Sequence, residues 1–186
     1  GAAEAVVVDP SGSAAEVRLR LAQLGASCAA ILVTHGHFDH ILGLADLAEG
    51  TGAPVYMAAG DRALLETPTE VWGVLVRAWV PDVLVEGGET VEAAGISFET
   101  LSVPGHSPGH VSYYANGCLF SGDVLFAGSV GRVDIPGADW ATLLASIRLL
   151  TETYPPDTTV YPGHGTPTTL AGEIARNPFL AELRVP

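Results

Sequence analysis

Residues 34–40 read Thr34-His35-Gly36-His37-Phe38-Asp39-His40, and this stretch decides how the rest of the chain is interpreted. It follows an apolar run at 29–34 that is typical of a buried strand. In an extended segment residues i and i+2 point the same way, so His35 and His37 can share one metal ion. Asp39 and His40 lie at the start of a predicted helix and are better placed for a neighbouring ion. Histidines this close together indicate a metal site, because adjacent imidazoles are costly without one.

The remaining candidate ligands each lie just past another predicted strand. His106 follows a strand at 96–103, Asp123 follows one at 118–121, and His164 follows one at 158–161. Loops at the ends of adjacent strands converge, which is where sites on sheet scaffolds collect. We therefore expect one ion on His35, His37 and His106, a second ion on Asp39, His40 and His164, and Asp123 as a bridge between them. Imidazole and carboxylate without thiolate suit divalent Zn, Fe or Mn, and we expect Zn.

Three further residues are expected to act around this site. His110 is left over once the ligands are assigned, and we interpret it as a hydrogen-bonding support for the ligand-bearing loop. Asp9 ends a strand at 6–8, and we expect it to accept backbone N–H bonds in a turn beside the site. Arg132 lies in a Gly-rich loop and is either a clamp for a substrate carboxylate or a partner in a surface salt bridge.

The pattern along the chain alternates strands and helices without repeats or linkers, and we expect residues 1–186 to form one hydrolase domain. A capping box of Ser13 and Glu16 predicts a helix at 14–24. The stretch 61–80 is helical by composition, with interruptions at Pro68 and Gly73. Further elements are predicted as a helix at 41–49, a strand at 55–58, a hairpin at 111–121 that turns at Asn116-Gly117, a helix capped by Asp139 that runs to 153, and a helix at 168–176.

Composition excludes several classes of partner. The chain has 21 acidic residues and eight basic ones, all Arg, and a formal net charge of −13. Such a surface repels phosphate backbones and anionic lipids, so we expect no nucleic acid and no membrane as partner. The absence of Lys excludes Schiff-base chemistry. Two cysteines cannot form a disulfide framework, and without a visible secretory signal we expect a cytoplasmic protein.

The motifs THGHFDH, PGHSPGH, SGD and PGHG, in this order, resemble the metallo-β-lactamase superfamily. SGDVLFAGSVGRVD and PGHGTPTTLAGEIARNPF are most similar to short bacterial glyoxalase II-like (hydroxyacylglutathione hydrolase-like) proteins. The resemblance implies an α+β fold, the αββα sandwich, in which two sheets pack face to face with helices outside. The family fold opens with a β-hairpin before the strand at 6–8, and we expect this hairpin to be missing from the chain as given. Full-length glyoxalase II holds glutathione with a basic helical region, and because only Arg176 and Arg184 are basic after His164 in the sequence as given, we expect weak recognition of glutathione.

The resemblance implies a binuclear, metal-dependent thioester hydrolase that acts on S-lactoylglutathione or a related 2-hydroxyacyl thioester. Two divalent ions would hold a bridging water as hydroxide near neutral pH. Asp39 and Asp123 are the expected catalytic carboxylates, Asp39 by orienting this hydroxide and Asp123 by bridging. A thiolate leaves without a proton, because free thiols have pKa values near ~8.5. An amide nitrogen needs a general acid, so a small thioester is favoured over a β-lactam.

One alternative remains within the same superfamily. The segment Gly131-Arg132-Val133-Asp134 is also similar to persulfide dioxygenases, which use one iron held by two histidines and one aspartate. Those ligands correspond to His35, His106 and Asp123 or a close subset, so ligand identity alone does not separate the two activities. The late PGHG motif favours the hydrolase.

Overall fold

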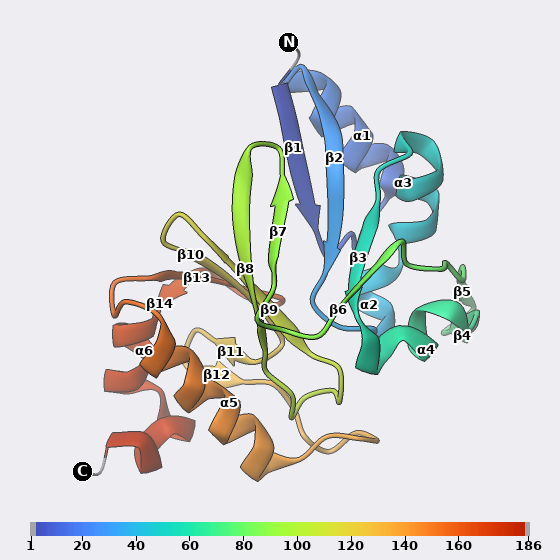
Figure 1. Ribbon diagram of the computed structural model, residues 1–186. Coiled ribbons are helices and arrows are strands. Elements are labelled where there is room, and N and C mark those ends of the chain that lie inside the picture. The colour runs from blue at the N-terminus through green and yellow to red at the C-terminus, as the bar shows by residue number, and fades with distance from the viewer. Residues whose placement is uncertain (1–2, 185–186) are drawn as a thin grey trace.

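The computed structural model describes residues 3–184, and Figure 1 shows two β-sheets with helices on their outer sides. Within these residues the first sheet has four parallel strands in the order β1-β2-β3-β6. Its strands are β1 (Ala3–Val8), β2 (Ala26–Val33), β3 (Val55–Ala58) and β6 (Val83–Val85). Its helices are α1 (Ala14–Gln23), α2 (Phe38–Ile41), α3 (Leu44–Thr51) and α4 (Arg62–Glu66), with a 3₁₀ turn at Ala59–Asp61.

The second sheet has six strands in the order β14-β13-β10-β9-β8-β7 across the described part of the chain. These strands are β7 (Thr90–Ala93), β8 (Ile96–Ser102), β9 (Val111–Ala115), β10 (Cys118–Gly122), β13 (Thr159–Pro162) and β14 (Thr168–Thr169). The remaining elements are the small hairpins β4 (Thr69–Val71) with β5 (Val74–Val76) and β11 (Leu125–Phe126) with β12 (Ser129–Val130), helices α5 (Trp140–Thr153) and α6 (Leu170–Arg176), and a 3₁₀ segment at Pro178–Arg184.

Buried side chains divide into three layers, as an αββα sandwich requires. Alternate residues of β2 point to opposite faces of its sheet. Ala30 and Leu32 join the core between the two sheets, whereas Ile31 and Val33 pack with α3 on the outer face. A third cluster lies between the second sheet and α5, and it includes Leu119, Val160, Leu143, Ile147 and Leu150. The expected fold class is therefore confirmed, and β2 reads as a continuous apolar run because both of its faces are buried.

Most expected elements are present, with two corrections. The helix at 14–23 forms, but the Ser13 side chain makes no capping hydrogen bond. The helical interpretation of 61–80 is wrong beyond Glu66, because the chain turns back as the β4–β5 hairpin. Trp72 and Gly73 adopt φ values of 50° and 79° at its tip, as a tight hairpin turn requires. Pro68 ends the helix, and the β-branched residues after it favour strands.

The sheets place their loops at one edge. Strand β2 ends directly before Thr34, β10 directly before Asp123, and β13 two residues before His164. Among residues 3–184, no helix combines the length and the apolar character needed to cross a bilayer.

Candidate metal centre

The three histidines expected to share the first ion lie together. The ring nitrogens available from His35, His37 and His106 all lie within 4.8 Å of one another. His37 Nδ1 lies 2.8 Å from His106 Nε2, so the two rings converge on one point. His35 and His106 are buried, and His37 is half-buried towards the surface. We call this group the first cluster.

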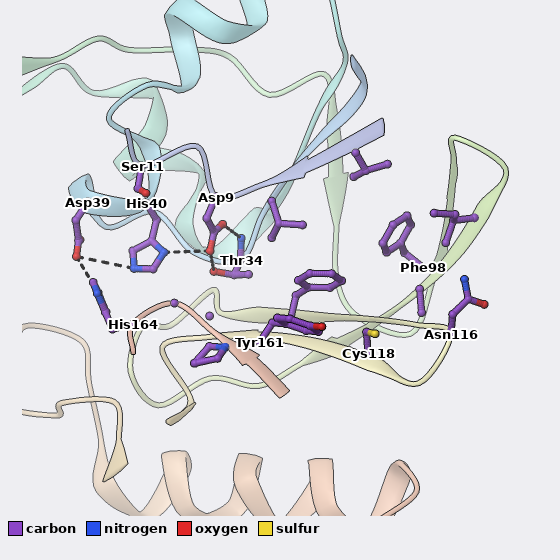
Figure 2. A pocket seen from close by; sticks show the side chains of 18 residues that line it. Asp9, Ser11, Thr34, Asp39, His40, Phe98, Asn116, Cys118, Tyr161 and His164 are labelled. Carbon is purple, nitrogen blue, oxygen red and sulfur yellow. Dashed lines mark hydrogen bonds and ion pairs between the residues drawn. The ribbon is translucent and has the colours of Figure 1, made fainter. Parts of the chain in front are cut away.

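The second expected group also forms, and we call Asp39, His40 and His164 the second cluster. Their ligand atoms again lie within 4.8 Å of one another. Asp39 Oδ2 lies 3.1 Å from His164 Nε2 and 3.9 Å from His40 Nε2. Figure 2 shows the His40 ring between Asp9 on one side and Asp39 on the other, with His164 next to Asp39.

Asp123 lies between the two clusters. Its Oδ1 is 3.3 Å from His40 Nε2, and its Oδ2 is 3.5 Å from both His106 Nε2 and His164 Nε2. Gly163 makes this approach feasible, because a Cβ at that position would lie 2.2 Å from Asp123 Oδ1. The carboxylate is thus within reach of both expected ions, as a bridge must be.

Asp9 orients one histidine of each cluster with a proton on Nδ1, so that Nε2 faces the site. Its Oδ2 accepts a hydrogen bond from His40 Nδ1 at 3.0 Å, and because a carboxylate only accepts, the proton lies on Nδ1. Thr34 donates its backbone N–H to Oδ1 and its hydroxyl to Oδ2, both at 2.7 Å. The Thr34 oxygen, 3.0 Å from His35 Nδ1, therefore accepts from that nitrogen. The Asp9 carboxylate thus accepts a backbone N–H as expected, but that of Thr34 and not one of its own turn, and it reaches His40 directly and His35 through Thr34.

His106 and His110 have equally defined partners. His106 Nδ1 donates to the Arg132 carbonyl oxygen at 2.9 Å, which leaves Nε2 facing the site. His110 is fully buried, and its Nε2 accepts the backbone N–H of Asp123 at 3.0 Å. This bond fixes the start of the loop that carries the bridging carboxylate. The geometry suits the supporting part expected of His110.

Burial and neighbouring charge set the protonation of the rings. Burial, together with neighbouring imidazoles, lowers the pKa of His35 and of His37 below the usual value. Burial also lowers the pKa of His110, to about 3. For His40 burial acts in the same direction, but the carboxylates of Asp123 and Asp9 outweigh it and raise its pKa to about 10. Burial raises the pKa of Asp123, but the imidazoles of His40, His106 and His164 together outweigh it, so this pKa lies below its usual value.

The donor atoms at this site have the chemistry that a metal ion requires. Among the described residues, His35 Nε2 is buried without a hydrogen-bond partner, and His40 Nε2 and Asp123 Oδ1 are buried with only their mutual 3.3 Å ion-pair contact. Buried polar atoms are normally paired, so unpaired ones need an explanation. All three point into the two clusters, and all three are donor atoms that divalent Zn, Fe or Mn accept. The ligand set therefore fits two divalent ions.

A cavity of about 630 Å³ opens onto both clusters, and we call it the mouth. Beyond the metal ligands, its wall is formed by Phe38, Phe126, Val130, Arg132, Ile135 and Pro136. Arg132 is exposed and makes two bonds to Asp134, Nε to Oδ1 at 2.7 Å and Nη2 to Oδ2 at 2.9 Å. Arg132 therefore forms the surface salt bridge that was one of its two expected interpretations, and it does so at the edge of the mouth.

The sequence interpretation missed Asp61, a buried carboxylate next to the first cluster. Its position in the sequence could have indicated this place. Asp61 follows β3, and β3 ends at the same edge of the sheet as the ligand loops. The sequence interpretation also missed Thr34, the first residue after β2. Its hydroxyl donates to Asp9 and accepts from His35 Nδ1, so it links the two side chains.

Comparison with known proteins decides the family. The sequence profile of the Metallo-beta-lactamase superfamily matches residues 1–164. The chain belongs to this superfamily. It is 38% identical over 184 residues to the probable metallo-hydrolase YqgX of Bacillus subtilis, a match that spans 95% of this chain and 87% of that protein. It is 35% identical over 184 residues, with the same coverage of both proteins, to hydroxyacylglutathione hydrolase GloC of Haemophilus influenzae.

Solved structures of the superfamily agree. The crystal structure of the B3 metallo-β-lactamase BLEG-1 superposes with a TM-score of 0.90 at 38% identity, over 96% of this chain and 90% of that one. TTHA1623 in a di-iron-bound form has a TM-score of 0.83 at 40% identity, over 93% and 88% of the two chains. This chain is therefore a metal-dependent hydrolase of the superfamily, and its His and Asp clusters occupy the edge of the fold where its loops converge.

Proposed function

We propose that this chain hydrolyses small thioesters, namely S-lactoylglutathione or a related 2-hydroxyacyl thioester, with two zinc ions on the two clusters. One observation carries the choice of thioester. Among the described residues that line the mouth, Arg132 is the one proton-bearing side chain outside the ligand set, and it is committed to Asp134. Without a general acid, the favoured leaving group is one that departs as an anion, and a thiolate does so readily.

The first-cluster histidines would hold one ion and the second-cluster residues the other, with Asp123 shared. Bound divalent ions supply hydroxide near neutral pH and polarise a substrate carbonyl. Asp39 is half-exposed at the mouth, so its carboxylate is placed to accept a hydrogen bond from the attacking water and to orient it. The apolar side chains of Phe38, Phe126 and Ile135 exclude bulk water from the acyl group.

The thiol end of the substrate has little to bind. Recognition of an anionic tripeptide needs free positive charge outside the metal centre. Arg132 is already paired, and the chain carries a net charge of −13, which disfavours attraction of anions. We therefore propose that selectivity for the thiol is loose and that the acyl end is held mainly at the metal centre.

A second candidate activity is hydrolysis of β-lactams, which is favoured by the 38% identity to a protein described as a B3 metallo-β-lactamase.

One assay separates the candidate activities. Protein loaded with zinc or, in a parallel sample, with iron(II) is given S-lactoylglutathione, a chromogenic cephalosporin or glutathione persulfide, while thiol release, lactam opening and oxygen uptake are recorded. The proposal predicts thiol release from the thioester without oxygen uptake, and kcat/KM for the cephalosporin at least about a hundredfold lower, since an amide nitrogen lacks a proton donor here. Oxygen uptake with the persulfide and no thioester turnover would establish the dioxygenase instead.

A further inference from the structure

A carboxylate outside both clusters is buried beside the first one. Asp61 ends the 3₁₀ turn after β3 and is 1% exposed. It makes no capping bond to α4, the helix that follows it. A buried carboxylate is costly unless its oxygens accept hydrogen bonds, so its partners indicate what it does.

Both partners are backbone amides of ligand-bearing loops. Asp61 Oδ2 accepts the N–H of Gly36 at 3.0 Å, and Oδ1 accepts the N–H of Gly109 at 2.7 Å. Gly36 lies between the ligands His35 and His37. Gly109 lies in the loop between β8 and β9, which carries the third ligand, His106. One side chain thus joins the two loops that together supply every histidine of the first cluster.

The Asp61 segment packs tightly against the loop that carries Gly109. A Cβ at position 109 would lie 2.2 Å from the Asp61 backbone nitrogen and 2.7 Å from its Oδ1, so the two segments are in direct backbone contact. Because both hydrogen bonds are charge-assisted and shielded from water, they are stronger than ordinary backbone bonds. The second cluster has no hydrogen bond to Asp61, and its His40 is held by Asp9 instead.

We infer that Asp61 is a positioning residue for the first metal ion: it fixes the spacing of the His35–His37 loop and the His106 loop before metal binds. It contacts neither substrate nor metal, and it acts through the two loop backbones. The inference goes beyond the proposed function, since it concerns metal affinity and holds for any substrate.

The test is zinc affinity, measured by competition with a chromophoric chelator, for Asp61→Asn in two backgrounds. His164→Ala leaves the first cluster intact, and His37→Ala leaves the second. The amide of Asn keeps the shape but directs an N–H at one of the two backbone donors, so one bond is lost. In the His164→Ala background we expect the zinc dissociation constant to rise about 10- to 100-fold, as when a supporting hydrogen bond is removed. In the His37→Ala background we expect a change below about threefold, since Asp61 makes no bond to that cluster.

The matched control is Asp82→Asn. Asp82 Oδ2 accepts the backbone N–H of Val55 at 2.8 Å, at the opposite end of β3 from Asp61. We expect this variant to bind zinc as its parent does in both backgrounds.

Two results would overturn the inference: unchanged affinity of Asp61→Asn at the first cluster, or an equal loss at both clusters, which would mark a general effect on folding. If Asp61→Asn does not fold, amide hydrogen exchange of the unaltered, metal-free chain decides. Slow exchange of the Gly36 and Gly109 amides supports the inference, and exchange at the rate of open loops overturns it.

Discussion

Replacement of Asp9 by Asn tests how the site prepares its histidines. The carboxylate receives three hydrogen bonds, from Thr34 N, Thr34 Oγ1 and His40 Nδ1, at 2.7, 2.7 and 3.0 Å. Asn retains one oxygen for the backbone N–H, but its amide nitrogen donates where the carboxylate accepted. When metal binds Nε2, the neutral His40 ring must keep its proton on Nδ1, where Asn offers no acceptor. The Thr34 hydroxyl must also reverse, and it donates to His35 Nδ1.

Asp9→Asn therefore disfavours, for one histidine in each cluster, the form with a proton on Nδ1 and a free Nε2 that metal binding requires. A hydrogen bond to a charged group contributes about 1.5–3 kcal/mol, and the Asp9 side chain is 11% exposed, so solvent screens it little. Since about 1.4 kcal/mol corresponds to tenfold in affinity, we expect zinc to bind about 10- to 100-fold more weakly at both clusters. Thr34→Val should weaken the first cluster alone, because Thr34 relays Asp9 only to His35.

The assay is a two-site zinc titration against a chromophoric chelator, with circular dichroism to verify the fold. Asp139→Asn is a matched control, because Asp139 accepts the backbone N–H and the hydroxyl of one threonine, Thr142, as Asp9 does with Thr34. Wild-type affinity of folded Asp9→Asn at both clusters would refute the tautomer argument. Equal weakening by Asp139→Asn would show that the loss is not specific to the site.

Three further predictions follow from the same geometry. Asp123→Ala should lower the affinity of both ions, whereas His164→Ala should weaken only the second, and elemental analysis after dialysis distinguishes these outcomes. Asp134→Asn should free Arg132 and raise kcat/KM for a glutathione thioester severalfold relative to the same acyl group on an uncharged thiol; an unchanged ratio would show that the ion pair does not limit recognition. Burial lowers the pKa of His110 from 6.5 to about 3, so the unfolded chain takes up its proton first as pH falls. Below pH 6.5 metal-free protein should therefore lose stability through this residue, with a slope that approaches about 1.4 kcal/mol per pH unit. Urea unfolding at pH 6.5 and 5.5 should therefore show a smaller loss for His110→Gln than for the unaltered chain.

Local spacing made the metal centre predictable. His35, His37, Asp39 and His40 lie within six positions at the end of an apolar strand, and this spacing predicts their division between two ions. The β9–β10 hairpin was equally accessible, since Asn116-Gly117 specifies its turn.

Contacts between distant segments were not predictable in the same way. The bonds from Asp61 join it to Gly36 and Gly109, which lie 25 and 48 positions away, and no local pattern marks a carboxylate that serves backbone amides. The β4–β5 hairpin was not predicted, because the composition of 61–80 favours a helix and only Pro68 and Gly73 mark the breaks. Arg132 and Asp134 are only two positions apart, so the sequence allowed a salt bridge between them. Whether Arg132 binds Asp134 or a substrate carboxylate depends on how the loop folds, which the sequence does not specify.

The number of metal ions per chain tests the central claim most directly. Protein purified without chelator is loaded with zinc, dialysed and analysed for bound metal, and anomalous diffraction from its crystals locates the ions. We predict two ions per chain, one on the first cluster and one on the second, with Asp123 between them. A stoichiometry that never exceeds one, with His40 and His164 turned away from the metal, would contradict the binuclear site and favour the mononuclear dioxygenase.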